Sequence, residues 1–220
     1  FSSQKGTNMF KKAVFMAIFS LFFTASVQAS DDQVGVVSAQ NPMVVDESAK
    51  TITVLAKVNG KYFTENTRHA VVFKDGRFGD KPVFIALANQ NDFYQAMKKI
   101  GAKPGNNMTL KNGPETHVEG DKIKIEVTWN GAPKSYDINE VITDSNGKQI
   151  DMRFGGNEAT AKSFNTGCIA CLDSCSVGII SNHTYTHGAV EKRNEVVFHG
   201  NKDVLPPDGT FVAISFRVAN

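Results

Sequence analysis

Alternating apolar and polar positions along the chain predict a domain built mainly from strands. The clearest alternation covers residues 121–129, with apolar side chains at Ile123, Ile125, Val127 and Trp129 and charged or hydroxyl side chains between them. Residues 51–58 show the same period of two and end at Asn59-Gly60, a pair typical of a hairpin turn. Both segments are therefore predicted to be strands with one buried face.

Shorter apolar runs predict the remaining strands. Turn residues bound each of these runs. Residues 134–141 follow Asn130-Gly131, so we expect them to return as the hairpin partner of 121–129. The other predicted strands cover residues 69–73, 82–87, 196–198 and 211–218.

One helix is clear from the sequence, over residues 92–100. Phe93, Met97 and Ile100 fall on one helical face, Asn91 is the expected N-cap, and Gly101 ends the helix. Many strands with a single clear helix predict an α+β fold with an antiparallel or mixed sheet. A doubly wound parallel sheet would need more helices.

The N-terminal region is typical of a signal peptide. Lys11 and Lys12 follow Met9 and precede an apolar run over residues 13–23, after which small residues lead to Ala29. We expect residues 1–29 to be upstream sequence and signal peptide, cleavage after Ala29, and an exported protein, periplasmic or extracellular. The apolar run is shorter than the roughly 20 residues of a membrane span, so no stable span is expected after cleavage. An uncleaved N-terminal anchor is the alternative.

Charge and composition narrow the function of the remaining single domain, residues 30–220. The whole chain has 24 basic and 22 acidic residues, and three of the lysines precede residue 30, which leaves 21 against 22. Such a balance, without a basic stripe, argues against a nucleic-acid partner. Nucleotide-binding and G-x-S-x-G hydrolase motifs are also missing from the sequence, so no residue is assigned a catalytic role.

The three cysteines form the strongest candidate site. Cys168, Cys171 and Cys175 have the spacing C-x2-C-x3-C, and they lie within residues 154–187, the longest stretch without strong periodicity, which we expect to be a long loop. The spacing equals the last three positions of a bacterial ferredoxin motif, although Asn165 and Ser176 replace its first cysteine and its proline. The fourth ligand could come from Asp173, His183, His187, His69, His117 or His199.

Two of these histidines are spaced as a ligand pair. His183 and His187 are four residues apart, so they share a face on either a helix or a strand. We include them as candidate metal ligands, with exposed polar residues as the alternative. His69 lies within a predicted strand, where a hydrogen-bonded core or edge position is expected rather than a ligand.

Three interpretations of the cysteines stay open. The first is an iron–sulfur cluster or a single iron, copper or zinc ion, where zinc accepts three thiolates and an imidazole and Cu(I) is satisfied by three sulfurs. The second is thiol–disulfide chemistry, and the third is a structural disulfide between Cys168 and Cys171. An exported protein favours disulfides, and a general secretory signal without twin arginines argues against a preassembled cluster. The odd number of cysteines argues against a purely structural role.

The chain resembles the YdjY family of exported proteins. The resemblance rests on Arg68-His69-Ala70-Val71-Val72, on the segment 101–107 with its Lys-Pro-Gly-Asn-Asn turn, and on residues 167–182, which contain all three cysteines. Proteins of this family are commonly described as ferredoxin-like from their cysteines. The resemblance therefore implies an iron–sulfur or electron-transfer role. Separately, we expect a redox partner protein and no enzymatic activity, with a non-enzymatic periplasmic binding or accessory module that has a structural disulfide as the alternative.

Overall fold

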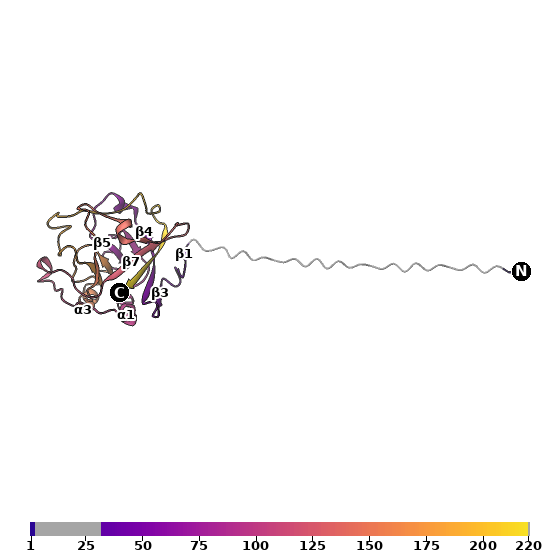
Figure 1. Ribbon diagram of the computed structural model, residues 1–220, viewed down its shortest axis with the longest axis horizontal. Coiled ribbons are helices and arrows are strands. Elements are labelled where there is room, and N and C mark those ends of the chain that lie inside the picture. Colours follow the sequence, from indigo (N-terminus) through magenta and orange to yellow (C-terminus); the bar gives the residue numbers. More distant parts are fainter. Residues whose placement is uncertain (3–31, 220) are drawn as a thin grey trace.

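The structure is a computed structural model that describes residues 1, 2 and 32–219 (Figure 1). The predicted signal peptide lies outside these residues, so it stays a prediction, as does a mature domain beginning at residue 30. Within the described part of the chain, every helix is too short or too polar to cross a bilayer.

A curled mixed sheet forms the body of the described structure. Its strands, in spatial order, are β10 (Met152–Phe154), β12 (Ile180–Asn182), β11 (Cys168–Cys171), β5 (His69–Phe73), β6 (Phe84–Ala86), β4 (Thr51–Val58), β14 (Phe211–Val218), β7 (Ile123–Thr128) and β8 (Tyr136–Asp137), and β3 (Met43–Asp46) also pairs with β4. The pairs β5–β6 and β11–β12 are parallel and the others are antiparallel. This arrangement confirms the predicted sheet-dominated fold with a mixed sheet.

The sheet curls until its first strand approaches its last ones. An antiparallel bridge joins Lys122 to Arg153, and the backbone N–H of Phe154 donates to the carbonyl of Asp121 at 2.9 Å. The curl encloses the main core, to which β7 contributes Ile123 and Ile125. The apolar side chains that alternate along the sequence of β7 thus form part of the inner face of the curled sheet.

Two smaller strand pairs lie beside this sheet. The hairpin of β1 (Gln33–Val34) and β2 (Val37–Ser38) packs on Leu55 of β4 and Ala213 of β14. The second pair joins β9 (Ile142–Asp144) to β13 (Phe198–Gly200). Two short 3-10 helices are η1 (Gly60–Phe63) and η2 (Gly113–Glu115).

The predicted helix is present as α1 (Gln90–Lys99), and it begins earlier than expected. The side chain of Asn89, rather than Asn91, is the N-cap and accepts the N–H of Asn91 at 2.8 Å. Phe93 packs edge-on against Phe216 of β14, with ring centres 4.8 Å apart. Burial of this apolar face holds the helix against the sheet.

The expectation of one clear helix is imprecise, because the described residues contain two more. The predicted strand over residues 134–141 pairs with β7 only through β8 and then becomes α2 (Ile138–Val141). Asp137 and Glu140 form a capping box, in which each side chain accepts a backbone N–H at the helix start. This local capping stops the hairpin after two residues.

The long loop predicted for residues 154–187 is wrong as a description of its whole length. It contains α3 (Glu158–Phe164), which lies beside α1, together with β11 and β12 (Figure 1). The turn predicted at Asn59-Gly60 likewise begins η1 instead of a hairpin. Short elements of three to seven residues carry too little periodicity to be recognised without their partners.

Candidate metal centre

An irregular strand brings two of the cysteines together. On a regular strand, residues three apart point to opposite faces of the sheet. The pairing of β11 with β5 shifts register between Cys168 and Ala170 and again between Ala170 and Cys171. A β-bulge of this kind re-aims a side chain, and here the two sulfurs and a ring nitrogen of His69 all lie within 4.8 Å of one another.

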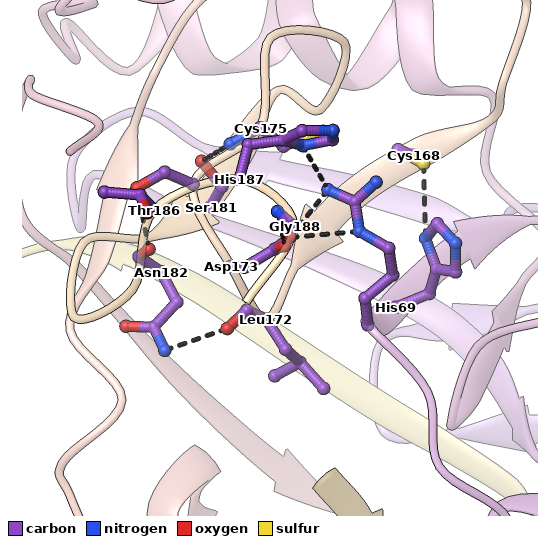
Figure 2. Close-up of polar contacts among 12 residues, drawn as sticks. His69, Cys168, Leu172, Asp173, Cys175, Ser181, Asn182, Thr186, His187 and Gly188 are labelled. Atoms are coloured by element: carbon purple, nitrogen blue, oxygen red, sulfur yellow. Dashed lines mark hydrogen bonds and ion pairs between the residues drawn. The ribbon is translucent and has the colours of Figure 1, made fainter. Parts of the chain in front are cut away.

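His69 enters this group from the neighbouring strand. It pairs with Cys171 across the β5–β11 ladder, and its Nδ1 lies 3.6 Å from the Sγ atom of Cys168 (Figure 2). The imidazole is 4% exposed, and the ring of Phe78 packs at 5.3 Å from it. The expected core position is therefore correct, and in this core position His69 also faces a thiol.

Cys175 completes the cluster from the connection between β11 and β12. The three cysteines pack together with Val72 and are at most 1% exposed. Cys175 belongs to this packed group but lies outside the set of His69, Cys168 and Cys171 ligand atoms that approach within 4.8 Å of one another. Here the thiols are free, and we call His69, Cys168, Cys171 and Cys175 the thiol cluster.

The cluster is electrostatically asymmetric. Hydrogen bonds with Cys168 and Cys175, together with burial, hold the pKa of Cys171 well above its usual value. A hydrogen bond from Cys171, and then the His69 imidazole, lower the pKa of Cys168 despite its burial. The Cys171 thiol also lowers the pKa of Cys175 to about 7, helped by the positive charge of Arg68. The cluster thus favours thiolate at its two outer sulfurs.

The connection that carries Cys175 is buried, so its backbone polar groups need partners inside the protein. Asn182 donates its side-chain amide to the carbonyl of Leu172 at 3.0 Å, and the hydroxyl of Ser181 accepts the N–H of Cys175 at 3.2 Å (Figure 2). The N–H of Ser174 donates to the carbonyl of Tyr185 at 2.8 Å. These contacts fix a loop that joins two parallel strands with far fewer residues than the usual crossover.

One further amide supports the same loop from α3. Asn157, at the N-cap of α3, donates its Nδ2 group to the carbonyls of Cys175 and Gly178, both at 2.9 Å. Gly178 is in contact with the cluster, since a Cβ there would lie 2.8 Å from the Sγ atom of Cys171. The loop and the cysteines are therefore packed without room for larger side chains.

We expect replacement of Asn157 by glycine to destabilise the protein. Glycine keeps the left-handed backbone found at this position, φ +56°, while the amide donor is lost. Two buried carbonyls then lack partners, and each costs roughly 1–3 kcal/mol. Urea unfolding of the reduced, metal-free protein measures the loss, with Asn194→Gly as the matched control, because Asn194 is exposed and has the same left-handed backbone, φ +50°. A difference under 0.5 kcal/mol would contradict the role given to Asn157.

A buried ion pair lies against the cluster. Both Nε and Nη2 of Arg68 donate to Oδ1 of Asp173, at 3.0 and 2.6 Å, and Oδ2 of Asp173 accepts the N–H of Gly188 at 2.8 Å. Burial opposes the charge of Arg68, but the negative charges of Cys175 and Asp173 raise its pKa overall. The sequence had offered Asp173 as a fourth ligand, and in the structure it pairs with arginine instead.

The predicted pair His183 and His187 is divided in the structure. His187 turns to the ion pair, with its Nδ1 atom 2.9 Å from Nη2 of Arg68 (Figure 2). Because a guanidinium only donates, this Nδ1 accepts and the imidazole is neutral. Burial and the adjacent Arg68 charge lower the pKa of His187 accordingly. His183 instead contacts His117, and His199 lies on β13. Among the described residues, the ligand atoms within 4.8 Å of one another belong to His69, Cys168 and Cys171, and none of the other histidines joins them.

Two contributors to the site carried no distinct signal in the sequence. His69 precedes Cys168 by 99 residues, and Asn157 precedes Cys175 by 18. Only the pairing of β5 with β11 makes His69 a neighbour of the cysteines. The sequence did offer His69 among six possible fourth ligands, and Arg68 and His69 fall within a segment that resembles the YdjY family.

The fold and site define a strand-rich α+β domain with a buried cluster of three cysteines and a histidine. Comparisons with known proteins agree with this class. The family described as the YdjY domain matches residues 43–217. A protein of Escherichia coli strain K12, described as uncharacterized protein YdjY, is 52% identical over 182 residues, which cover 83% of this chain and 81% of that protein. No solved structure matches the chain.

The chain belongs to the YdjY family. Its described structure contains a cysteine and histidine cluster that is compatible with metal binding.

Proposed function

We propose that this chain is an exported protein that binds one thiophilic metal ion through Cys168, Cys171, Cys175 and His69. The observation that carries the proposal is the group of His69, Cys168 and Cys171, whose ligand atoms lie within 4.8 Å of one another, with Nδ1 of His69 3.6 Å from Sγ of Cys168. Cys175 lies outside this group but packs in the same buried cluster, from which it would supply the fourth ligand. Ligands of a tetrahedral zinc ion lie about 3.5–3.8 Å apart, given Zn–S bonds of about 2.3 Å and Zn–N bonds of about 2.1 Å.

The same distances favour a single ion over an iron–sulfur cluster. In a cluster, each thiolate binds a different iron atom, so the sulfurs stand farther apart than ligands of one ion. Here the Sγ atoms of Cys168 and Cys171 lie within 4.8 Å of each other. The space around the sulfurs is tightly filled, since a Cβ atom on Gly178 would lie only 2.8 Å from Sγ of Cys171. Iron–sulfur binding and electron transfer to a partner protein therefore become the less favoured form of the proposal.

The donor set and its charge suit zinc. Three thiolates and a neutral imidazole around a divalent ion leave one negative charge, and Arg68 lies where its charge interacts with Cys175 and Cys171. Cu(I) is the alternative that three soft sulfurs would satisfy without His69. When bound, such an ion would supply folding energy and hold Cys171 as a thiolate.

Thiol–disulfide chemistry is the second candidate function. The lowered pKa of Cys175, about 7, favours it because the thiolate is the nucleophile. Burial opposes it, since the three cysteines are at most 1% exposed and a protein disulfide would have to reach them. Metal binding is therefore the function that the geometry supports best.

Titration of the reduced, metal-free protein with Co²⁺ tests the proposal. We expect thiolate-to-cobalt charge-transfer bands that saturate at one equivalent and disappear when zinc is added. His69→Gln should keep these bands but weaken binding at least about 10-fold, because even outer-shell losses cost 10–100-fold. His199→Gln, on β13, is the matched control and should change nothing.

Two outcomes would reject a single ion at this site. The first is a spectrum without charge-transfer bands. The second is saturation at several equivalents, with the bands unaffected by Cys168→Ser. Reduction of a test disulfide by the metal-free protein, lost in Cys175→Ser, would instead support the thiol–disulfide function.

A further inference from the structure

A second pair of potential ligands lies outside the thiol cluster. His117 is exposed and His183 is partly buried, and their ring centres are 5.1 Å apart with an angle of 42° between the ring planes. Sequence spacing suggested His187 as the partner of His183. The structure replaces it with His117, which is 66 residues away along the chain.

Hydrogen bonds fix the same tautomer in both rings. The Nδ1 atom of His117 contacts the carbonyl oxygen of His183, and the Nδ1 atom of His183 lies 2.7 Å from the carbonyl oxygen of Val118. Because a carbonyl only accepts, each Nδ1 carries a hydrogen. In the neutral rings, each Nε2 then holds a lone pair. Metal-binding histidines use this arrangement, in which one nitrogen donates to a backbone carbonyl and the other binds the ion.

The separation of the rings also suits a shared ion. Two imidazoles that bind one tetrahedral ion through bonds of about 2.1 Å have ring centres about 5 Å apart. The observed 5.1 Å agrees with this value. Simple packing of two histidines could produce a similar distance, but it would not require both Nδ1 atoms to donate to the backbone.

The backbone around both rings is held in place before any ligand arrives. The side chain of Asn107 donates to the carbonyl of His117 at 2.8 Å, and the N–H of His183 donates to the carbonyl of Asp151 at 2.8 Å. The N–H of Val118 donates to the buried hydroxyl of Ser174 at 2.9 Å, beside Cys175. Preorganised ligands lose little freedom on binding, which favours affinity.

We propose that His117 and His183 form a second, surface metal site that binds a divalent ion such as Ni²⁺, Zn²⁺ or Cu²⁺ through their two Nε2 atoms. Imidazole is a good ligand for these three ions. Two protein ligands leave the other coordination positions to water or to an incoming ligand, so this site exchanges its ion more readily than the buried thiol cluster. The site does not depend on the function proposed for the cysteines.

Nitrogen NMR of the imidazoles in the full chain tests the premise of this site. Long-range correlation spectra of the metal-free protein should show the Nδ1–H tautomer for His117 and His183. Substoichiometric Ni²⁺, which is paramagnetic, should then broaden the ring signals of these two residues before those of His199. An Nε2–H tautomer in either ring, or equal broadening of all histidines, would overturn the proposal.

Binding measurements with variants complete the test. Equilibrium dialysis against Ni²⁺, after one equivalent of Zn²⁺ has been added, should show a site weakened at least 10-fold in both His117→Gln and His183→Gln. His199→Gln should bind as the unmodified protein does, and equal weakening in it would overturn the assignment. The NMR signals are residue-specific and are recorded without zinc, so failure of the cysteines to bind zinc leaves them unaffected, and failure here leaves the cobalt bands of the cysteines unaffected.

Discussion

Replacing Cys171 by serine should remove most of the stability that zinc confers on this protein. Cys171 is fully buried, and its sulfur lies within 4.8 Å of both the Cys168 sulfur and a ring nitrogen of His69, so it is one of the proposed ligands. With free zinc at 1,000 times the dissociation constant, the unmodified protein should gain about 4 kcal/mol. For a domain of this size, the gain corresponds to roughly 8–16 °C in Tm, at 2–4 °C for each kcal/mol.

The variant should retain about 1.4 kcal/mol of this gain, because a roughly 100-fold weaker affinity leaves zinc at only about 10 times the new dissociation constant. Serine at a buried site also lowers the stability of the metal-free protein, so each Tm is compared with its own chelator-treated reference. His199→Gln should show the full zinc effect. Equal zinc-induced shifts in Cys171→Ser and the unmodified protein would contradict the assignment of Cys171 as a ligand.

Separating the buried ion pair should cause the second large effect. Arg68→Met leaves the Asp173 carboxylate, which is fully buried, with the Gly188 N–H as its remaining described partner. Removing one member of a buried pair costs about 3–5 kcal/mol. Asp173→Asn keeps an acceptor for Gly188 but removes the charge that Arg68 requires, so it should also destabilise the protein.

A double-mutant cycle isolates the interaction between these two residues. The combined variant Arg68→Met/Asp173→Asn should be at least about 2 kcal/mol more stable than the sum of the single effects, because neither charge is then left unpaired. Urea unfolding with reductant and chelator keeps metal binding out of the comparison. Additive effects, within about 0.5 kcal/mol, would show that the pair contributes no coupling.

The sheet was predictable where strands are long and half-buried. In β7 the apolar residues Ile123, Ile125 and Val127 face the core, and the alternation of apolar and polar residues in the sequence predicted this buried face. Residues 51–58 and 211–218 were also correct as β4 and β14. By contrast, β11 is buried along its whole length and has no alternation, so its strand character was hidden in the sequence.

The cysteines were predictable as a group, but the geometry of the cluster was not. A spacing of three residues does not bring Cys168 and Cys171 to one side unless the strand is irregular, and that irregularity depends on pairing with β5. The nearest imidazole belongs to His69 rather than to His183 or His187, because strand pairing determines neighbours over long sequence separations. Spacing rules find ligands within one segment and miss those supplied by another.

X-ray absorption spectroscopy of the protein loaded with one equivalent of zinc identifies the atoms bound to the ion. We expect a first shell of three sulfur atoms at about 2.3 Å and one nitrogen at about 2.1 Å, without a second metal nearby. A shell of oxygen and nitrogen alone, or clear metal–metal scattering, would contradict the proposed site.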